Sequence, residues 1–227
     1  MSQLKIISWN IWGGKNLPEI INCLKEADAD IIALQEVLED EDGKNNNAEE
    51  VAKTLGYNWK FTNTKTLSPS VSYLLQQHDI KSSKHWGNAV LSKHSIINSE
   101  SHTLSENNSR TALKITIEFE KGNIDILSTH LVHAAHPSDV RVGQVENLLK
   151  LISNNNTIIA GDFNDTSESE SITKIKERMK CGEDASHTNK DEKIDYIFTT
   201  KNINIIKSGV IKSEASDHLP IYAIIEI

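Results

Sequence analysis

Residues 157–164 read TIIAGDFN, an apolar run that ends abruptly in a cluster of polar residues. A short run rich in isoleucine, bounded by a glycine and turn-forming residues, predicts a buried β-strand. The side chains of Asp162 and Asn164 therefore lie where this strand ends. The same order of apolar run and polar end recurs along the chain, and it leads to the fold class that we predict.

Three other predicted strands also end in a polar side chain. Asn10 follows the run KIISW, Glu36 follows IIALQ, and His130 follows IDILST. In open α/β sheets, ligand sites form at the carboxyl ends of the strands. These side chains are therefore candidates for the same functional site as Asp162 and Asn164.

Two more polar clusters stand just before a predicted strand. Asp195 precedes the run YIF, and the pair Asp217 and His218 precedes the last apolar run of the chain. If these two strands run antiparallel to the others, their starts lie at the edge where the other strands end. All six clusters then converge on one pocket.

Strand patterns outnumber helical patterns. Strands are predicted over residues 4–9, 30–34, 72–76, 88–92, 111–119, 124–128, 157–160, 195–199, 203–210 and 220–227. Helical periodicity is present over residues 18–26, 48–55, 139–152 and 171–179. Many strands with few helices predict a layered α/β protein with substantial antiparallel pairing. No repeat or linker divides the chain, so we predict a single domain over residues 1–227.

Composition excludes several classes of protein. Sixty of the 227 residues are Leu, Ile, Val or Phe, which is enough for a packed core and excludes intrinsic disorder. The net charge of −8 and the three arginines exclude a basic coat for nucleic acid, although they leave room for a local positive groove. The sequence contains no apolar run of about 18 residues, so no transmembrane helix is predicted.

Two features bear on the compartment. Cys23 and Cys181 form no C-x-x-C pair and fit no metal-ligand spacing, as in reduced proteins of the cytoplasm. The first residues run directly into a strand pattern, without the succession that marks a signal peptide. We therefore expect a cytoplasmic protein, and we expect a monomer.

The predicted pocket contains the functional groups that phosphate-ester hydrolysis requires. It would hold four carboxylates, two carboxamides and two histidines. Hard oxygen ligands without thiolates favour Mg²⁺ or Mn²⁺ over a structural zinc. A divalent cation beside a His and an Asp can activate water against a phosphate ester. Each cluster taken alone could be an ordinary turn or a solvated acid, but six such clusters at strand ends favour a site.

The polar clusters also match a family pattern in their order. The segments are SWNIW (8–12), LQEV (34–37), STHL (128–131), GDFN (161–164), IDYIF (194–198) and SDHLP (216–220). This ordered set resembles the endonuclease/exonuclease/phosphatase superfamily of metal-dependent phosphoesterases, and it spans nearly the whole chain. The resemblance implies a four-layered α/β sandwich, in which two central mixed, mostly antiparallel β-sheets are flanked by helices.

The resemblance also implies roles for the residues of the metal site. Glu36 would be the main ligand of Mg²⁺ or Mn²⁺, and Asn10 and Asp217 would complete its surroundings. Asp162 would orient or deprotonate the attacking water, and Asn164 would hydrogen-bond the phosphate or the nucleophile.

The two histidines would act on the phosphate. His218, held in its tautomer by Asp195, would be the general base or a donor to the phosphoryl oxygen, and we do not choose between His218 and Asp162 as the base. His130 would be a second donor to the phosphate.

Two further positions are candidates for phosphate binding. Arg110 opens a predicted strand where relatives place an arginine, and a guanidinium can bind two phosphate oxygens at once. Asn88 follows the glycine of the segment GNAVLS and could reach the site. A surface salt bridge for Arg110 and a structural role for Asn88 are the alternatives. Arg141 and Gln144, at the start of the long predicted helix, are expected to brace the loop that follows His130.

The function that we expect is a phosphodiesterase or nuclease-type hydrolase that depends on Mg²⁺ or Mn²⁺. Its partner is a phosphoester substrate, either nucleic acid or a small phosphorylated molecule. One alternative is a phosphatase or phospholipase-like hydrolase of a small or lipid phosphoester. The other is a non-catalytic binding domain that retains the fold.

Overall fold

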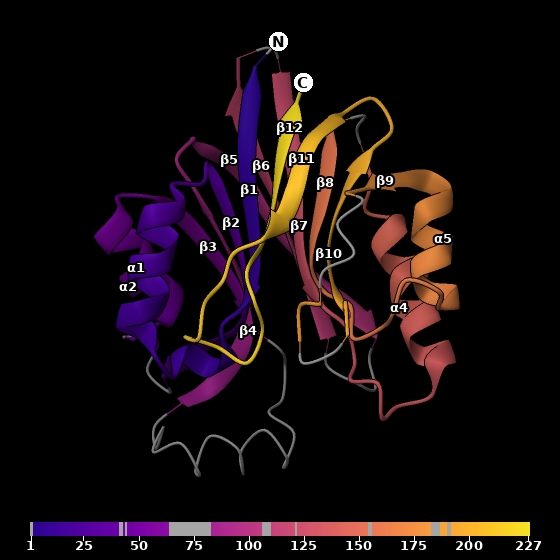
Figure 1. The fold of residues 1–227 in the computed structure, drawn as a ribbon, viewed down its shortest axis with the longest axis horizontal. Coiled ribbons are helices and arrows are strands. Elements are labelled where there is room, and N and C mark those ends of the chain that lie inside the picture. The colour runs from indigo at the N-terminus through magenta and orange to yellow at the C-terminus, as the bar shows by residue number, and fades with distance from the viewer. Residues whose placement is uncertain are drawn as a thin grey trace.

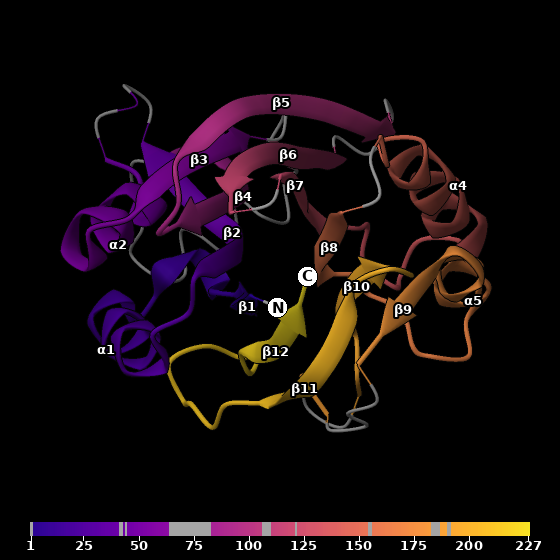
Figure 2. The same ribbon diagram turned by 90° about the horizontal axis from the view of Figure 1, so that it is seen from above.

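Two six-stranded β-sheets face each other at the centre of the molecule (Figures 1 and 2). The computed structural model describes residues 2–40, 43, 45–63, 83–105, 110–120, 122–153, 156–182, 187–189 and 192–227. The predicted strand at residues 72–76 lies outside the described residues. Both sheets are mixed, and most of their neighbouring strands run antiparallel, as predicted.

The first sheet has the strand order β11-β12-β1-β2-β4-β3. Its strands are β1 (Gln3–Asn10), β2 (Ile31–Asp40), β3 (Asn58–Asn63), β4 (Ser83–Ser92), β11 (Asn204–Val210) and β12 (Ile221–Glu226). Strands β1 and β2 pair in parallel, whereas β12 runs antiparallel to β1. The end of β1 and the start of β12 therefore lie at the same edge of the sheet.

The second sheet has the strand order β5-β6-β7-β8-β10-β9. Its strands are β5 (Ile96–Ser105), β6 (Arg110–Phe119), β7 (Gly122–His130), β8 (Thr157–Asp162), β9 (Met179–Cys181) and β10 (Asp195–Thr200). Strands β7 and β8 pair in parallel, and β10 runs antiparallel to β8. The arrangement repeats that of the first sheet, with two strands ending where a third begins.

Helices cover the outer face of each sheet. They are α1 (Leu17–Ala27) and α2 (Asn47–Leu55) on the first sheet, and α4 (Ser138–Leu149) and α5 (Glu170–Arg178) on the second (Figure 2). The layers are thus helix, sheet, sheet and helix, which confirms the predicted four-layered sandwich. All four helices overlap the helices predicted from periodicity.

Between the sheets, the side chains change from apolar to polar along each strand. The apolar core there includes Ile6 of the first sheet and Ile126 and Ile158 of the second. Because alternate residues of a strand point to the same face, the inward side chains two and four positions further along these strands are polar or small. The last inward side chains of these strands are Asn10, His130 and Asp162. The space between the sheets is therefore polar at the edge where these three strands end.

Close packing of β7 and β8 near this edge depends on a glycine. A Cβ atom at Gly161 would overlap the carbonyl oxygen of Thr129 in the neighbouring strand. Any other residue would push the two strands apart directly beside His130 and Asp162, which are partners in the register.

Among the described helices, none is both long and apolar enough to cross a membrane.

Candidate active site

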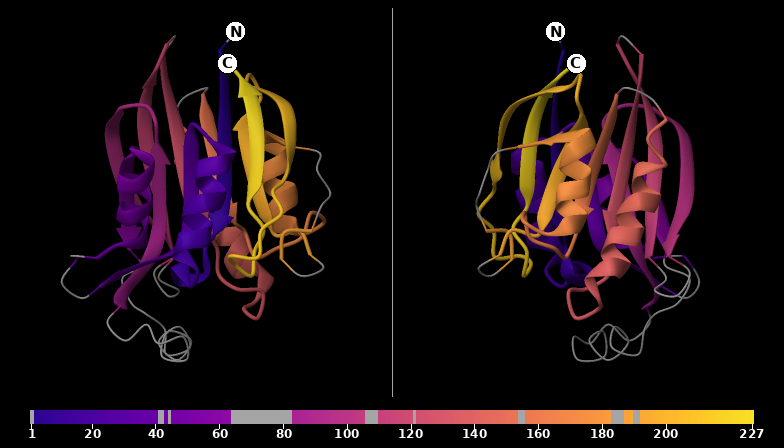
Figure 3. Two further views of the ribbon diagram at one scale, coloured as in Figure 1. Left: turned by 60° about the vertical axis from the view of Figure 1, so that its left-hand side comes forward. Right: turned by 90° about the vertical axis from the view of Figure 1, so that its right-hand side faces the viewer.

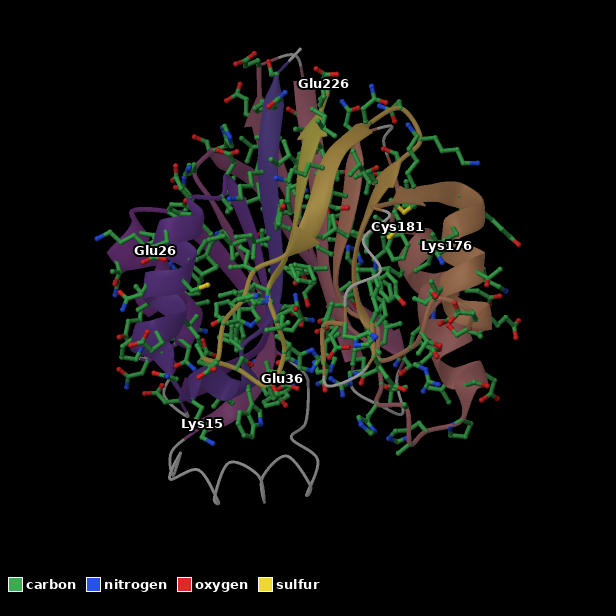
Figure 4. The ribbon with its side chains drawn as sticks, viewed as in Figure 1. Lys15, Glu26, Glu36, Lys176, Cys181 and Glu226 are labelled. Atoms are coloured by element: carbon green, nitrogen blue, oxygen red, sulfur yellow. The ribbon has the colours of Figure 1, made fainter. Side chains whose placement is uncertain are left out.

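The predicted polar clusters meet at one end of the sandwich. Glu36 lies at the end opposite the chain termini (Figure 4), and Figure 3 shows both termini together at the other end. In the second sheet, Asp162 pairs with His130 on one side and with Asp195 on the other. Strand register alone therefore places an imidazole and two carboxylates side by side.

A β-bulge directs Glu36 into the site. The register between β2 and β4 shifts between Leu34 and Val37, and Glu36 has a φ of 57°. A left-handed backbone is unfavourable for a residue with a side chain, with a cost of about 1–3 kcal/mol. Bulges of this kind occur next to active sites, where they re-aim a side chain. Here one carboxylate oxygen of Glu36 lies 4.0 Å from Nδ1 of His130.

Asp162 is the centre of the site. One of its carboxylate oxygens, Oδ2, accepts a hydrogen bond from the amide of Asn10 at 3.1 Å. The same oxygen lies 3.4 Å from Nε2 of His130 and 3.8 Å from Nε2 of His218. The other oxygen accepts the backbone N–H of Asn164 at 2.8 Å. Asp162 thus joins residues from four separate segments of the chain.

The ring of His218 is held by Asp195. Nδ1 of the imidazole lies 2.9 Å from Oδ2 of Asp195, and both residues are buried. Because a carboxylate only accepts, Nδ1 carries a proton and Nε2 is the nitrogen that faces Asp162. The indole N–H of Trp9 donates to the backbone carbonyl of His218 at 2.9 Å and fixes its main chain.

Burial and crowding shift the pKa values of these groups. Burial raises the pKa of Glu36 to about 8. Burial and the neighbouring carboxylate of Asp195 also raise the pKa of Asp162. Burial alone would lower the pKa of His218, but the contact with Asp195 outweighs it, and the pKa rises to about 10. An excess of buried carboxylates raises their pKa values and favours a nearby cation.

The phosphate-binding candidates lie on the side of β4 and β6. Burial lowers the pKa of Arg110, and the charges of Glu36 and Asp162 are close enough to offset part of this shift. The side chain of Arg110 nevertheless forms no ion pair or hydrogen bond with any described residue. The positive charge of Arg110 adds to burial in lowering the pKa of His130. The amide N–H of Asn88 donates to the carbonyl of Thr111 at 2.9 Å, so a phosphate contact by Asn88 would compete with this bond.

The donor chemistry of the site fits a divalent cation. Ligand atoms of Asp162, Asp195 and His218 lie within 4.8 Å of one another. Glu36 and Asn10, from the set suggested by the sequence, lie beside Asp162, and the third member of that set, Asp217, is exposed at the rim. Carboxylate and amide oxygens without thiolate suit Mg²⁺ or Mn²⁺.

Two residues next to the His218–Asp195 pair were not singled out in the sequence. The amide nitrogen of Asn189 lies 2.6 Å from Nε2 of His218. The hydroxyl of Thr188 accepts the backbone N–H of Asp195 at 3.2 Å. Both lie in the polar segment HTNKDEK, which has neither an apolar run nor a charge pattern to mark it.

Comparisons with known proteins agree with the fold and the motifs. The family model described as "Endonuclease/Exonuclease/phosphatase family" matches residues 7–218. No curated protein sequence matches the chain.

Solved structures share the fold at low sequence identity. An endonuclease/exonuclease/phosphatase from Beutenbergia cavernae is 20% identical, with a TM-score of 0.83 over 100% of this chain and 72% of its own. The catalytic domain of human nocturnin with bound sulfate is 20% identical, with a TM-score of 0.82 over 99% of this chain and 93% of its own. ANGEL2, a 2′,3′-cyclic phosphatase in complex with adenosine-2′,3′-vanadate, is 16% identical, with a TM-score of 0.77 over 98% and 95%.

Proposed function

The chain belongs to the endonuclease/exonuclease/phosphatase family, and from that premise we propose that it is a phosphodiesterase that requires Mg²⁺ or Mn²⁺. One observation carries the proposal: a buried carboxylate, Asp162, lies between two histidines, with Glu36 beside it and with Arg110, whose side chain has no ion-pair or hydrogen-bond partner among the described residues, close by. Such a site can hold an anion and a cation together, as phosphate-ester hydrolysis requires.

The cation would be held by Glu36, with Asn10 and Asp217 nearby. When bound, it supplies positive charge that neutralises the phosphate and the leaving oxygen. We prefer this set to Asp162, Asp195 and His218, because Nδ1 of His218 is already bonded to Asp195. Holding a cation next to Glu36 would also offset the burial that raises its pKa.

Asp162 and His218 would share the proton transfers. The raised pKa of His218 favours a protonated ring, whose Nε2–H can donate to a phosphoryl oxygen. Asp162 would then orient the water and accept its proton. Asp195 keeps the ring of His218 in place through Nδ1. If His218 is instead neutral when substrate binds, it takes the role of base and Asp162 the role of orienting group.

The remaining residues would bind the phosphate. Arg110 would contact two of its oxygens, and His130 would donate a hydrogen bond. Asn164 donates its amide N–H to the carbonyl of Leu131, which leaves its oxygen to accept from the nucleophilic water. Asn88 would contribute only if its bond to Thr111 opens.

The substrate that we propose is a phosphodiester in a nucleic acid or in a small phosphorylated molecule. The net charge of −8 disfavours tight binding to duplex DNA through bulk charge. The nocturnin structure holds a sulfate, and ANGEL2 is a cyclic phosphatase, so related folds accept small anions and nucleotides. A single domain, a monomeric state and a cytoplasmic location stay predictions from the sequence.

The test is hydrolysis of a substrate panel with and without Mg²⁺ or Mn²⁺. The panel holds bis-p-nitrophenyl phosphate, an abasic duplex, single-stranded DNA, a 2′,3′-cyclic nucleotide, sphingomyelin and an inositol polyphosphate. The variant His218→Ala serves as the control for contaminating activity. Metal-dependent turnover that the variant loses is the expected result. Turnover by neither protein, with the metal shown to bind, would contradict the proposal and favour a non-catalytic binding domain.

A further inference from the structure

A short segment between β9 and β10 is attached to both members of the His218–Asp195 pair. The backbone carbonyl of Thr188 accepts the N–H of Leu219 at 2.7 Å, and Asn189 forms a β-bridge with His218. The hydroxyl of Thr188, which is buried, accepts the N–H of Asp195 at 3.2 Å. The segment therefore fixes the main chains of two residues that are far apart in the sequence.

The side chain of Asn189 contacts the functional edge of the imidazole. Its amide nitrogen lies 2.6 Å from Nε2 of His218, while Nδ1 of the same ring lies 2.9 Å from Asp195. The ring is thus held at both nitrogens. A carboxamide suits this position because it offers NH₂ to the lone pair of a neutral ring and, turned by half a rotation, its oxygen to the N–H of a protonated ring. The contact does not depend on the protonation state of His218.

The contact also separates His218 from Asp162. Nε2 of His218 is 3.8 Å from Oδ2 of Asp162, which is too long for a hydrogen bond. Without a partner at Nε2, the ring could turn toward Asp162 and form a closed ion pair with it. Both groups would then be satisfied by each other rather than directed at a phosphate and a water.

We propose that Asn189 is a positioning residue: in the substrate-free protein its side-chain amide holds the Nε2 edge of His218 away from Asp162, and the substrate replaces the amide at Nε2 when it binds. This inference rests on the proposed function for its effect on turnover, whereas the contact itself can be observed without any substrate. Asn189 acts through His218 and is not itself assigned a contact with substrate.

The test compares Asn189→Ala with wild type and with a matched control, Asn58→Ala. The side-chain amide of Asn58 likewise forms a hydrogen bond, here to the backbone carbonyl of His94 at 3.0 Å. Its strand partner Ser92 lies at the end of β4 away from Asn88, so this bond is remote from the site. The first readout is the side-chain ¹⁵N resonances of His218 in the full chain, assigned by their loss in His218→Ala. The second is the hydrolysis of bis-p-nitrophenyl phosphate with Mg²⁺.

In Asn189→Ala we expect the Nε2 resonance of His218 to move, and kcat to fall about 10- to 100-fold at nearly constant KM, as for a misplaced catalytic group. Asn58→Ala should change neither, and Asn189→Gln, which keeps the amide, should recover part of kcat. If Asn189→Ala unfolds, the comparison of Asn189→Gln with Asn189→Leu, which keeps the size of the side chain without its polar atoms, replaces it.

Three results would overturn the inference. An unmoved Nε2 resonance would show that Asn189 does not hold the ring. A moved resonance with wild-type kcat would show that the contact has no role in the reaction. A fall in kcat of the same size in Asn58→Ala would show a general structural effect. If wild type hydrolyses nothing, the proposed function fails, while the NMR comparison still decides whether Asn189 holds His218.

Discussion

Replacing Glu36 by glutamine should make the metal-free protein more stable than wild type at alkaline pH and weaken its response to metal. Burial raises the pKa of Glu36 from 4.5 to about 8, so the folded state holds the proton more tightly than the unfolded chain. This contribution to stability is complete below about pH 4.5 and is lost as the pH rises through about 8. Glutamine, which has no charge, removes the loss.

The size of the effect follows from the shift in pKa. A shift from 4.5 to about 8 corresponds to about 5 kcal/mol at about 1.4 kcal/mol per pKa unit. The side chain keeps 15% of its surface exposed, and water there reduces the penalty. We therefore expect wild type to lose about 2–4 kcal/mol more than Glu36→Gln between pH 4.5 and 8.

The assay is urea unfolding of both proteins in EDTA at several pH values, followed by circular dichroism. The exposed residue Glu118 provides the control Glu118→Gln, which should keep the pH dependence of wild type. At pH 8, Mg²⁺ at 100 times the dissociation constant of wild type should stabilise wild type by about 2.7 kcal/mol and Glu36→Gln by at most about 1.4 kcal/mol, because the variant binds the metal at least about tenfold more weakly. An equal pH dependence of the free energy of unfolding in wild type and Glu36→Gln would refute the reasoning. It would mean that Glu36 is not a buried carboxylate with a raised pKa.

Four further substitutions have defined outcomes. Either His218→Ala or Asp162→Asn should lower kcat by about 10²–10⁴-fold with an unchanged circular dichroism spectrum, and wild-type turnover in either variant would contradict its assigned role. Arg110→Ala should raise KM about 10- to 100-fold, since a hydrogen bond to a charged group contributes about 1.5–3 kcal/mol; steady-state kinetics would show it, and an unchanged KM would exclude a phosphate contact. Gly161→Ala should destabilise the fold by at least about 1–3 kcal/mol, because its Cβ would overlap the carbonyl of Thr129; a midpoint of urea unfolding equal to wild type would contradict this packing.

The polar residues at the strand ends were predictable because side chains along a strand alternate between its two faces. Inward side chains alternate along each strand, so an apolar run followed by Asn10, His130 or Asp162 already indicates which face and which edge these residues occupy. The antiparallel partners complete the edge, and Asp195 indeed pairs with Asp162 in the register.

Arg141 was expected to brace the loop that follows His130, and it does contact this loop. Its guanidinium donates to the carboxylate of Asp165 at 2.9 Å and to the carbonyl of His133.

Other parts of the structure depend on geometry that the sequence does not encode locally. Strand β5 has a run of exposed, mostly polar residues in place of an alternating pattern, and it lies at the edge of its sheet, where its described neighbour is β6. The bulge at Glu36 places a non-glycine residue in a left-handed conformation, which no propensity predicts. Asn189 reaches His218 through a loop contact across 29 positions of sequence, so only the folded chain reveals it.

The most direct measurement is the rate of bis-p-nitrophenyl phosphate hydrolysis as a function of Mg²⁺ concentration, for wild type and Glu36→Gln in parallel. If Glu36 holds a cation beside Asp162 and His218, wild type shows saturable activation that EDTA abolishes. Glu36→Gln then needs at least about tenfold more metal, the equivalent of about 1.4 kcal/mol of lost binding. Hydrolysis by wild type that persists in EDTA, or identical metal dependence in the two proteins, would contradict a metal-dependent phosphoesterase site built on Glu36.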